Sequence, residues 1–313
     1  MAPQSMPVEA FPALYRSADE LSTTGQRAHL GANRWLLLLL MAGSFVAAVS
    51  PAAELFRTAS AVDDGLAAPI QKLLAGTAVA VTALSLWLSA ALRGAKHAEA
   101  WHDGRALAES VKSITWKYMM KAEPYGPALS AQEADEVFCD DLRKLLEEAR
   151  TRALPNAGAA GEQISSQMRE VRSHDIPSKL ALYLDARIKD QRDWYSSRST
   201  SHSASASRWS ATAIGANALA LICGIASISW VSANAAMGIA ATAASCCVAW
   251  TQLQRSADLA HAYACTSHEI GLLAPRASRV VSADQLARFV GDCEAAFSRE
   301  HTMWRARRKI ADG

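Results

Sequence analysis

Four uncharged apolar runs dominate the pattern of hydrophobic and polar positions along the chain. They cover Trp35–Ala53, Leu73–Leu92, Trp209–Val231 and Ala235–Trp250, and the last continues to about residue 252. A transmembrane helix needs roughly 17–25 apolar residues, and the first three runs reach that length. A helix of a soluble protein would show a charged stripe every turn or so, and none of these runs carries one. The pattern predicts an all-α integral membrane protein whose four transmembrane helices form two hairpins.

The residues that flank the runs predict how the chain is oriented in the bilayer. Tryptophans, which favour the headgroup layer, lie at run ends, at Trp35, Trp209, Trp230 and Trp250. Basic residues gather outside the hairpins, at Arg27, Arg34, Arg93, Lys96, Arg198 and Arg208. The segments that join the paired runs hold few cations. Because cytoplasmic flanks are rich in Lys and Arg, we expect a multi-pass protein of the cell inner membrane with both termini cytoplasmic.

Outside the runs, apolar residues recur every three or four positions, which is typical of amphipathic helices. One stripe follows the second run, at Leu107, Val111, Ile114 and Tyr118, and another lies near the C-terminus, at Leu286, Val290, Cys293 and Phe297. These long helices should pack as a cytoplasmic helical bundle. The serine-rich segment 190–210 contains neither Gly nor Pro and leads directly into the third run. It is therefore predicted to be helical and not a flexible linker.

The two halves of the chain repeat the same order of elements. Each has an amphipathic entry helix, two apolar runs and a long exit helix. The entry segments "YRSADELSTTGQRAHLGANRW" and "YLDARIKDQRDWYSSRSTSHSASASRW" share a Tyr, a Gln-Arg pair and a final Arg-Trp. We expect a tandem duplication, with one two-span unit at 11–150, a linker at 151–175 and a second two-span unit at 176–308.

Composition and motifs give little support to an enzyme or a nucleic-acid binder. Lys and Arg number 32 against 30 Asp and Glu, a net charge of +2. The chain has no GxxxxGK, GxGxxG or GxSxG motif. "HEIGLL" at His268 lacks the second histidine of a zinc HExxH site. We therefore expect no catalytic activity, no cofactor, no metal and no nucleic-acid partner.

Small and weakly polar side chains form seams along the apolar runs. The seam residues singled out as candidates for a pore or for helix packing are Thr82, Ser85, Ser89, Asn217, Gly224, Ser227, Thr242 and Ser245. Such seams allow helices to approach closely, so packing explains them directly. The seam residues could also line a water-filled path when several chains assemble. Because four helices fill their own centre with side chains, a pore would require a homo-oligomer.

The sequence resembles a known family, the prokaryotic SLATT proteins. "LYRSADELSTTGQRAHL" and "WHDGRALAESVKSITWKYMMKAEPY" are similar to one variety, and "YLDARIKDQRDWYSSRS" and "EAAFSREHTMWRARR" to another. The resemblance covers roughly 11–126 and 180–308. The resemblance implies that the chain acts as a membrane effector, built from two-span domains, in a nucleotide-signalling defence system. Its trigger would be a partner protein that makes or processes the nucleotide signal. The family's motif positions, candidates for cytoplasmic packing or gating, map to Tyr15, Trp101, Arg105, Glu109, Lys112, Trp116, Tyr183, Arg187, Trp194, Tyr195, Glu300 and Trp304.

Two functions from different classes follow from these observations. The first is an oligomeric effector that forms a pore or otherwise perturbs the membrane, as the resemblance implies. The alternative is a non-conducting membrane scaffold or regulator that recruits a cytoplasmic partner through its helical bundle. Ion flux distinguishes the two, because only the first depolarises cells or releases dye from liposomes.

Overall fold

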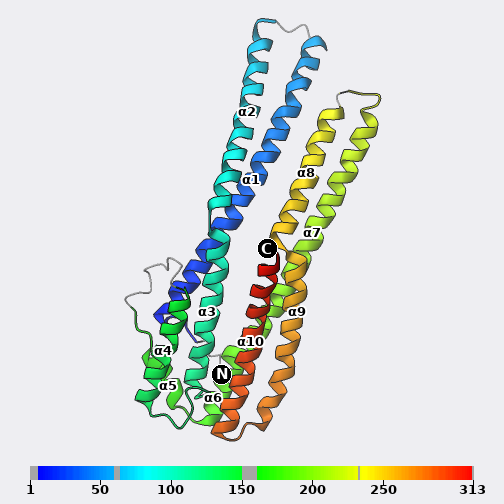
Figure 1. Ribbon diagram of the computed structural model, residues 1–313. Coiled ribbons are helices and arrows are strands. Elements are labelled where there is room, and N and C mark those ends of the chain that lie inside the picture. Colours follow the sequence, from blue (N-terminus) through cyan, green and yellow to red (C-terminus); the bar gives the residue numbers. More distant parts are fainter. Residues whose placement is uncertain (1–5, 60–63, 150–160, 232, 312–313) are drawn as a thin grey trace. The chain divides into compact units, whose positions relative to one another are not determined.

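The computed structural model describes residues 6–59, 64–149, 161–231 and 233–311, apart from the side chains of 50–59, 64–68, 93–94 and 299–311. All regular structure in these ranges is helical (Figure 1). The longer helices are α1 (Ala13–Ala59), α2 (Asp64–Gly94), α3 (His97–Met119), α4 (Ala131–Ala149), α7 (Asp190–Ala226), α8 (Ala233–Gln254), α9 (Ser256–Leu273) and α10 (Ala283–Ala311). The shorter elements are η1 (Val8–Ala10), α5 (Ser166–Ser173), α6 (Ile176–Tyr183), η3 (Leu184–Lys189) and η4 (Ala274–Arg279).

Four helical stretches of the described chain are long and apolar enough to cross a membrane. They are Ala13–Val49, Pro69–Met119, Ile176–Ala226 and Ala233–Arg279. Each contains all or most of one predicted apolar run, so the prediction of an all-helical chain with four such helices is confirmed. The third run outlasts its helix: α7 ends at Ala226, and the Ser227 hydroxyl donates to the Gly224 carbonyl at 2.7 Å in the turn that follows.

Residues 190–210 are helical, as their lack of glycine and proline predicted. They form the first turns of α7, which continues without interruption to Ala226. The helix is preceded by a π-helical segment, η3, that joins it to α6. π-helical turns are rare and often occur at functional sites. This segment contains Arg187, one of the residues selected from the sequence.

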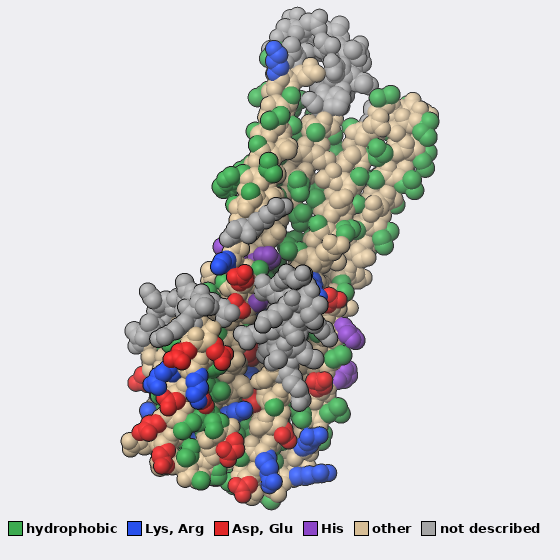
Figure 2. Space-filling model, viewed as in Figure 1, with side chains coloured by type: hydrophobic (Ala, Val, Ile, Leu, Met, Phe, Trp, Pro, Cys, Tyr) green, Lys and Arg blue, Asp and Glu red, His purple; other side chains and the backbone are tan. Residues whose placement is uncertain are grey.

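The chain folds into two compact units, and each draws on both halves of the sequence. The polar unit comprises Met1–Arg27, His97–Ser199 and His261–Gly313. The apolar unit comprises Ala28–Lys96 and Thr200–Ala260. Figure 2 shows acidic and basic side chains spread over the polar unit, and mostly hydrophobic and small side chains over the apolar one. The apolar runs belong to the apolar unit, so polar-unit residues lie outside these runs.

The polar unit is built around α3, which contacts α4, α5 and α10. Its largest fully buried side chains are mainly aromatic and include Trp116, Tyr118, Tyr125, Phe138, Tyr183 and Tyr195. Two of the surrounding helices begin with reciprocal caps. Ser130 and Glu133 exchange hydrogen bonds at the start of α4, and Ser282 and Gln285 do so at the start of α10. Such caps pair backbone N–H groups that have no partner inside the helix.

Two glycines allow α1 and α3 to approach backbone to backbone within the polar unit. A Cβ atom on Gly104 would lie 2.6 Å from the Ser22 nitrogen and 2.8 Å from the Ala18 carbonyl oxygen. A Cβ atom on Gly25 would lie 2.6 Å from the Trp101 nitrogen. Any larger residue must push the two helices apart. The sequence analysis did not select either glycine, because their partner helix is not evident from sequence.

The apolar unit is held together by contacts between small side chains. The Ser44 hydroxyl of α1 donates to Thr242 of α8 at 3.0 Å. Trp209 and Trp250 pack edge to face, with ring centroids 6.3 Å apart, where α7 meets α8. Many large hydrophobic side chains remain exposed in the single chain; on α7 they include Ile214, Leu219, Leu221, Ile222 and Ile225. That surface suits hydrocarbon rather than water.

Candidate functional site

Several of the candidates for packing or gating meet in the core of the polar unit. The Trp116 side chain is 1% exposed and that of Tyr183 is completely buried. Their rings pack edge to face with centroids 5.6 Å apart. Phe11, which precedes α1, packs against the other side of Trp116, with centroids 6.4 Å apart. This aromatic core joins the N-terminal segment to α3 and α6.

A second aromatic group joins α3, α7 and α9. The Arg105 guanidinium lies over the Trp194 ring, 5.1 Å from its centroid, and the Arg198 guanidinium lies 5.6 Å from it. Trp194 and Tyr195 each pack against Tyr263 of α9, with centroids 5.5 Å apart in both pairs. Cation–π contacts of this kind contribute on the order of 1 kcal/mol when partly desolvated.

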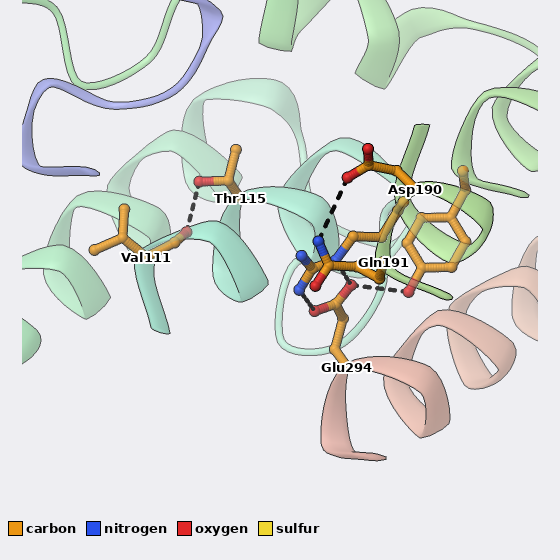
Figure 3. A network of polar contacts seen from close by, with 7 residues as sticks. Val111, Thr115, Asp190, Gln191 and Glu294 are labelled. Atoms are coloured by element: carbon orange, nitrogen blue, oxygen red, sulfur yellow. Dashed lines mark hydrogen bonds and ion pairs between the residues drawn. The ribbon is translucent and has the colours of Figure 1, made fainter. Parts of the chain in front are cut away.

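A buried ion pair is the central polar feature of the unit (Figure 3). Arg187 and Glu294 are 1% and 0% exposed, and Arg187 donates from Nε to Oε1 at 3.0 Å and from Nη2 to Oε2 at 2.8 Å. The Tyr183 hydroxyl donates to the same Oε1 at 2.8 Å. The Phe297 ring covers the guanidinium at 4.7 Å. The arrangement fastens the π-helical segment to α10.

Other charges surround this ion pair. Burial alone would lower the pKa of Arg187, but the Glu294 carboxylate and its hydrogen bonds outweigh that effect and raise it. Burial, reinforced by the nearby Arg187 cation, lowers the pKa of the Lys112 ammonium. The carboxylates of Glu109 and Asp190 act in the opposite direction. The cluster therefore balances its charges, with carboxylates placed against Arg187 and Lys112.

Two buried nitrogen atoms in this region have no hydrogen-bond partner among the described residues. They are Nη1 of Arg187 and Nε1 of Trp116. An unpaired buried donor costs roughly 1–3 kcal/mol, so any movement of the cluster that pairs them would be favoured by that amount. Both oxygens of the Glu294 carboxylate therefore accept hydrogen bonds, whereas one nitrogen of Arg187 and the indole nitrogen of Trp116 on α3 have none among the described residues.

The remaining candidates of α3 and α10 are Trp101, Glu300 and Trp304. Trp101 stacks on the neighbouring His102 ring with centroids 4.5 Å apart, close to the contact between α1 and α3. Glu300 and Trp304 fall in the last turns of α10, but their side chains lie outside the described part of the structure.

Glu294, the partner of Arg187, is not among the candidates predicted from the sequence. It occurs one position after Cys293 and four after Val290, both on the apolar stripe of α10. A carboxylate next to such a stripe usually points to solvent, and its partner lies 107 positions away. The sequence does contain one indication of this pairing. Arg187 and Glu294 carry opposite charges, and each lies at the margin of an apolar stripe.

The seam residues of the apolar unit have varied surroundings. Ser85 is buried, Ser89, Gly224, Ser227 and Thr242 are half-buried, and Thr82, Asn217 and Ser245 are exposed in the single chain. Their hydroxyl groups donate to carbonyl oxygens of their own helices, as Thr82 does to Ala78 at 2.8 Å. Asn217 Nδ2 likewise donates to the Ala213 carbonyl at 2.9 Å. Gly224 lies against Met237 of α8, whose sulfur would be 3.1 Å from an added Cβ.

Comparison with protein families places these features in a known context. An all-helical chain with four helices long and apolar enough to cross a membrane, together with a polar helical unit, is typical of a helical membrane protein. A family model described as SMODS and SLOG-associating 2TM effector domain 3 matches residues 12–180, and the one described as domain 1 matches residues 183–304. The chain belongs to the SLATT family and carries two SLATT domains in tandem. No curated protein and no solved structure matches it significantly.

The described residues contain no group of three or more His, Cys, Asp or Glu side chains that could hold a metal ion. The family descriptions concern effector domains with two membrane spans and indicate no catalytic activity. The buried ion pair can hold the π-helical segment against α10, and its stability depends on the charges of Arg187 and Glu294. Both properties suit a membrane effector.

Proposed function

We propose that the protein is a homo-oligomeric membrane effector that forms a pore, or otherwise perturbs the bilayer, in a prokaryotic nucleotide-signalling defence system. The two SLATT domains support the effector role, because their family descriptions name association with SMODS and SLOG. The trigger is a partner protein of that signalling system. Suicide or dormancy of the infected cell would follow from loss of the membrane potential.

The observation that best supports assembly is the outward placement of polar side chains in the apolar unit. Thr82, Asn217 and Ser245 are exposed in the single chain, on helices whose other exposed residues are mainly apolar. The Thr82 and Ser245 hydroxyls donate to carbonyl groups of their own helices, but the Asn217 amide keeps one N–H donor and its oxygen without a side-chain partner among the described residues. An unsatisfied polar group in hydrocarbon costs several kcal/mol, so Asn217 favours contact with another copy or with water. Further copies of the chain would supply either environment.

The proposed topology places the four apolar helices in the inner membrane as two hairpins. An even number of spans leaves both termini on one side, and the basic residues around Arg27, Lys96 and Arg208 favour the cytoplasmic side for them. The polar unit would then be the cytoplasmic helical bundle. The whole chain would consist of two two-span units, 11–150 and 176–308, joined by the linker 151–175.

The buried cluster gives this effector a candidate route for gating. Arg187 lies in the π-helical segment directly before α7, the helix that carries Asn217. A partner that alters the packing of α10 or α3 would act on the Arg187–Glu294 pair. We propose that the aromatic and charged candidates of the polar unit act as packing or gating residues in this way.

Liposome flux tests the proposal. Full-length protein, reconstituted in its assembled form together with its signalling system, should release an encapsulated dye or dissipate an imposed potential. Asn217→Leu should reduce either the flux or the assembly, whereas the control Ile214→Leu, on the exposed apolar face of α7, should change neither. If the assembled and triggered protein releases nothing, the scaffold function is the correct one.

A further inference from the structure

A second group of cations lies where α3 ends. Arg172 of α5 is 5% exposed, and its Nη1 donates to the carbonyl oxygens of Tyr118 and Tyr125 at 2.6 and 3.1 Å. Its guanidinium also lies 4.9 Å from the centroid of the Tyr118 ring. These contacts hold Arg172 against the loop that follows α3. That loop contains Lys121, whose φ of 55° turns the backbone sharply.

Lys179 of α6 adds a third cation to the cluster. The residue is only 4% exposed, although lysine rarely buries so completely unless it is paired. Among the described residues, no side-chain hydrogen bond or ion pair joins its ammonium to a partner. Burial, together with the charges of Lys121 and Arg172, lowers the pKa of Lys179 to about 8. The electrostatic neighbours of this ammonium are therefore mainly repulsive.

The local carboxylates do not balance these charges. Among the described residues, Asp175 at the start of α6 is the one acidic group that acts on Lys179, and its effect is smaller than those of burial and of the Lys121 and Arg172 charges. Asp135 acts on Arg172, but it accepts hydrogen bonds from Tyr118 and from Arg169. The Arg187 site shows the contrast, because there a buried carboxylate pairs directly with the cation. Buried cations without such a partner form a place where an anion lowers the energy of the fold.

We propose that Lys121, Arg172 and Lys179 form a binding site for the phosphate group of a soluble ligand. An ammonium acts on phosphate as a point charge and a guanidinium as a planar donor, so this set suits a doubly charged oxyanion. The proposal goes beyond the effector function and would hold equally for a scaffold. It gives the polar unit a ligand site of its own, separate from the membrane helices.

A soluble source of phosphate fits the position of the site better than a lipid headgroup. Helix α3 has 23 residues, and at 1.5 Å per residue it is roughly 35 Å long. The cluster lies at its C-terminal end, after Met119, whereas the apolar run ends before its N-terminal residue, His97. Along the chain, the whole length of this helix separates the cluster from that apolar run.

Pyrophosphate binding to the full-length protein in detergent tests the proposal. Titration with pyrophosphate should raise the unfolding temperature more than sodium chloride does at equal ionic strength. Lys179→Gln should weaken the apparent affinity at least tenfold, while the same variant without ligand should unfold at a higher temperature than the wild type. Lys144→Gln provides a matched control, because Lys144 is exposed on α4 and pairs with Asp141. Its response should match that of the wild type.

Two results would overturn the inference. The first is an equal response of wild type and Lys179→Gln to pyrophosphate, or a response that sodium chloride reproduces. The second concerns the source of the phosphate, and uses protein reconstituted in phosphatidylcholine vesicles with and without phosphatidylglycerol. If phosphatidylglycerol abolishes the pyrophosphate response, the site binds lipid headgroups and the soluble ligand is wrong. Neither result depends on ion flux, so the effector function is tested separately.

Discussion

Replacing Glu294 by glutamine tests whether the buried ion pair organises the polar unit. In the native protein the two oxygens of Glu294 accept hydrogen bonds from Nε and Nη2 of Arg187, and Oε1 also accepts one from Tyr183. Glutamine has almost the same shape but presents an NH₂ group in place of one oxygen. A donor then faces a donor, and the guanidinium keeps its charge in a site that is 1% exposed.

The expected loss follows from the burial of both partners. Breaking a buried pair by removing one charge costs about 3–5 kcal/mol, because the other charge stays buried without compensation. Since 1 kcal/mol shifts the unfolding temperature by roughly 2–4 °C in large domains, the unfolding temperature of the variant should fall by roughly 6–20 °C. The double variant Arg187→Met/Glu294→Leu should recover most of this loss, because it leaves no lone charge.

Thermal unfolding of the full chain in detergent, followed by circular dichroism, measures these differences. Glu170→Gln serves as the control, because Glu170 is exposed on α5 and the change should leave the unfolding temperature within about 1 °C. An unfolding temperature of Glu294→Gln within about 2 °C of the wild type would refute the reasoning. So would a double variant no more stable than the single one, because the loss would then reflect packing and not charge.

Two further predictions concern stability. Lys179→Met should stabilise the protein at pH 7 by at most about 3 kcal/mol, because the folded pKa of about 8 lies below the ordinary 10.5. The cost of keeping the Lys179 ammonium charged in the fold is present below pH 8 and disappears as the pH rises to 10.5. The stability gained by Lys179→Met should therefore be smaller at pH 10 than at pH 7 in unfolding curves. An equal gain at both pH values would contradict the stated cause. Gly104→Ala should cost about 1–3 kcal/mol by separating α1 from α3, whereas Gly291→Ala, which meets nothing within 4 Å, should be neutral or stabilising in the same melts. Equal effects of the two alanines would show that the close approach is unimportant.

The sequence was sufficient for the features that depend on neighbouring residues. The apolar runs follow from the hydrophobic pattern, and the helical serine-rich segment follows from the absence of glycine and proline. The family motif positions also led to Tyr183, Arg187 and Trp116, which lie together in the core. Side chains that recur on one helical face keep their relative positions whatever the partner, so local patterns identify them.

Features that depend on distant residues could not be predicted in this way. The ion pair joins positions 187 and 294, and the carboxylate looked like an ordinary solvent-facing residue next to an apolar stripe. The close approach of α1 and α3 depends on Gly25 and Gly104, which have no meaning until the two helices cross. The combination of both sequence halves in each compact unit is likewise a tertiary property. In every case the partner is selected by packing in three dimensions.

Asn217 illustrates how the structure sharpens a pattern that the sequence leaves open. The seam hydroxyls of Thr82 and Ser245 donate to their own helices, so they can face hydrocarbon, another helix or water at little cost. Asn217 differs, because an amide has two N–H donors and an acceptor oxygen, and its only side-chain hydrogen bond among the described residues is to Ala213. One donor and the oxygen remain for a second copy or for water. Asn217→Leu should therefore weaken crosslinked oligomers if another chain satisfies the amide, or leave them intact and suppress flux if water does.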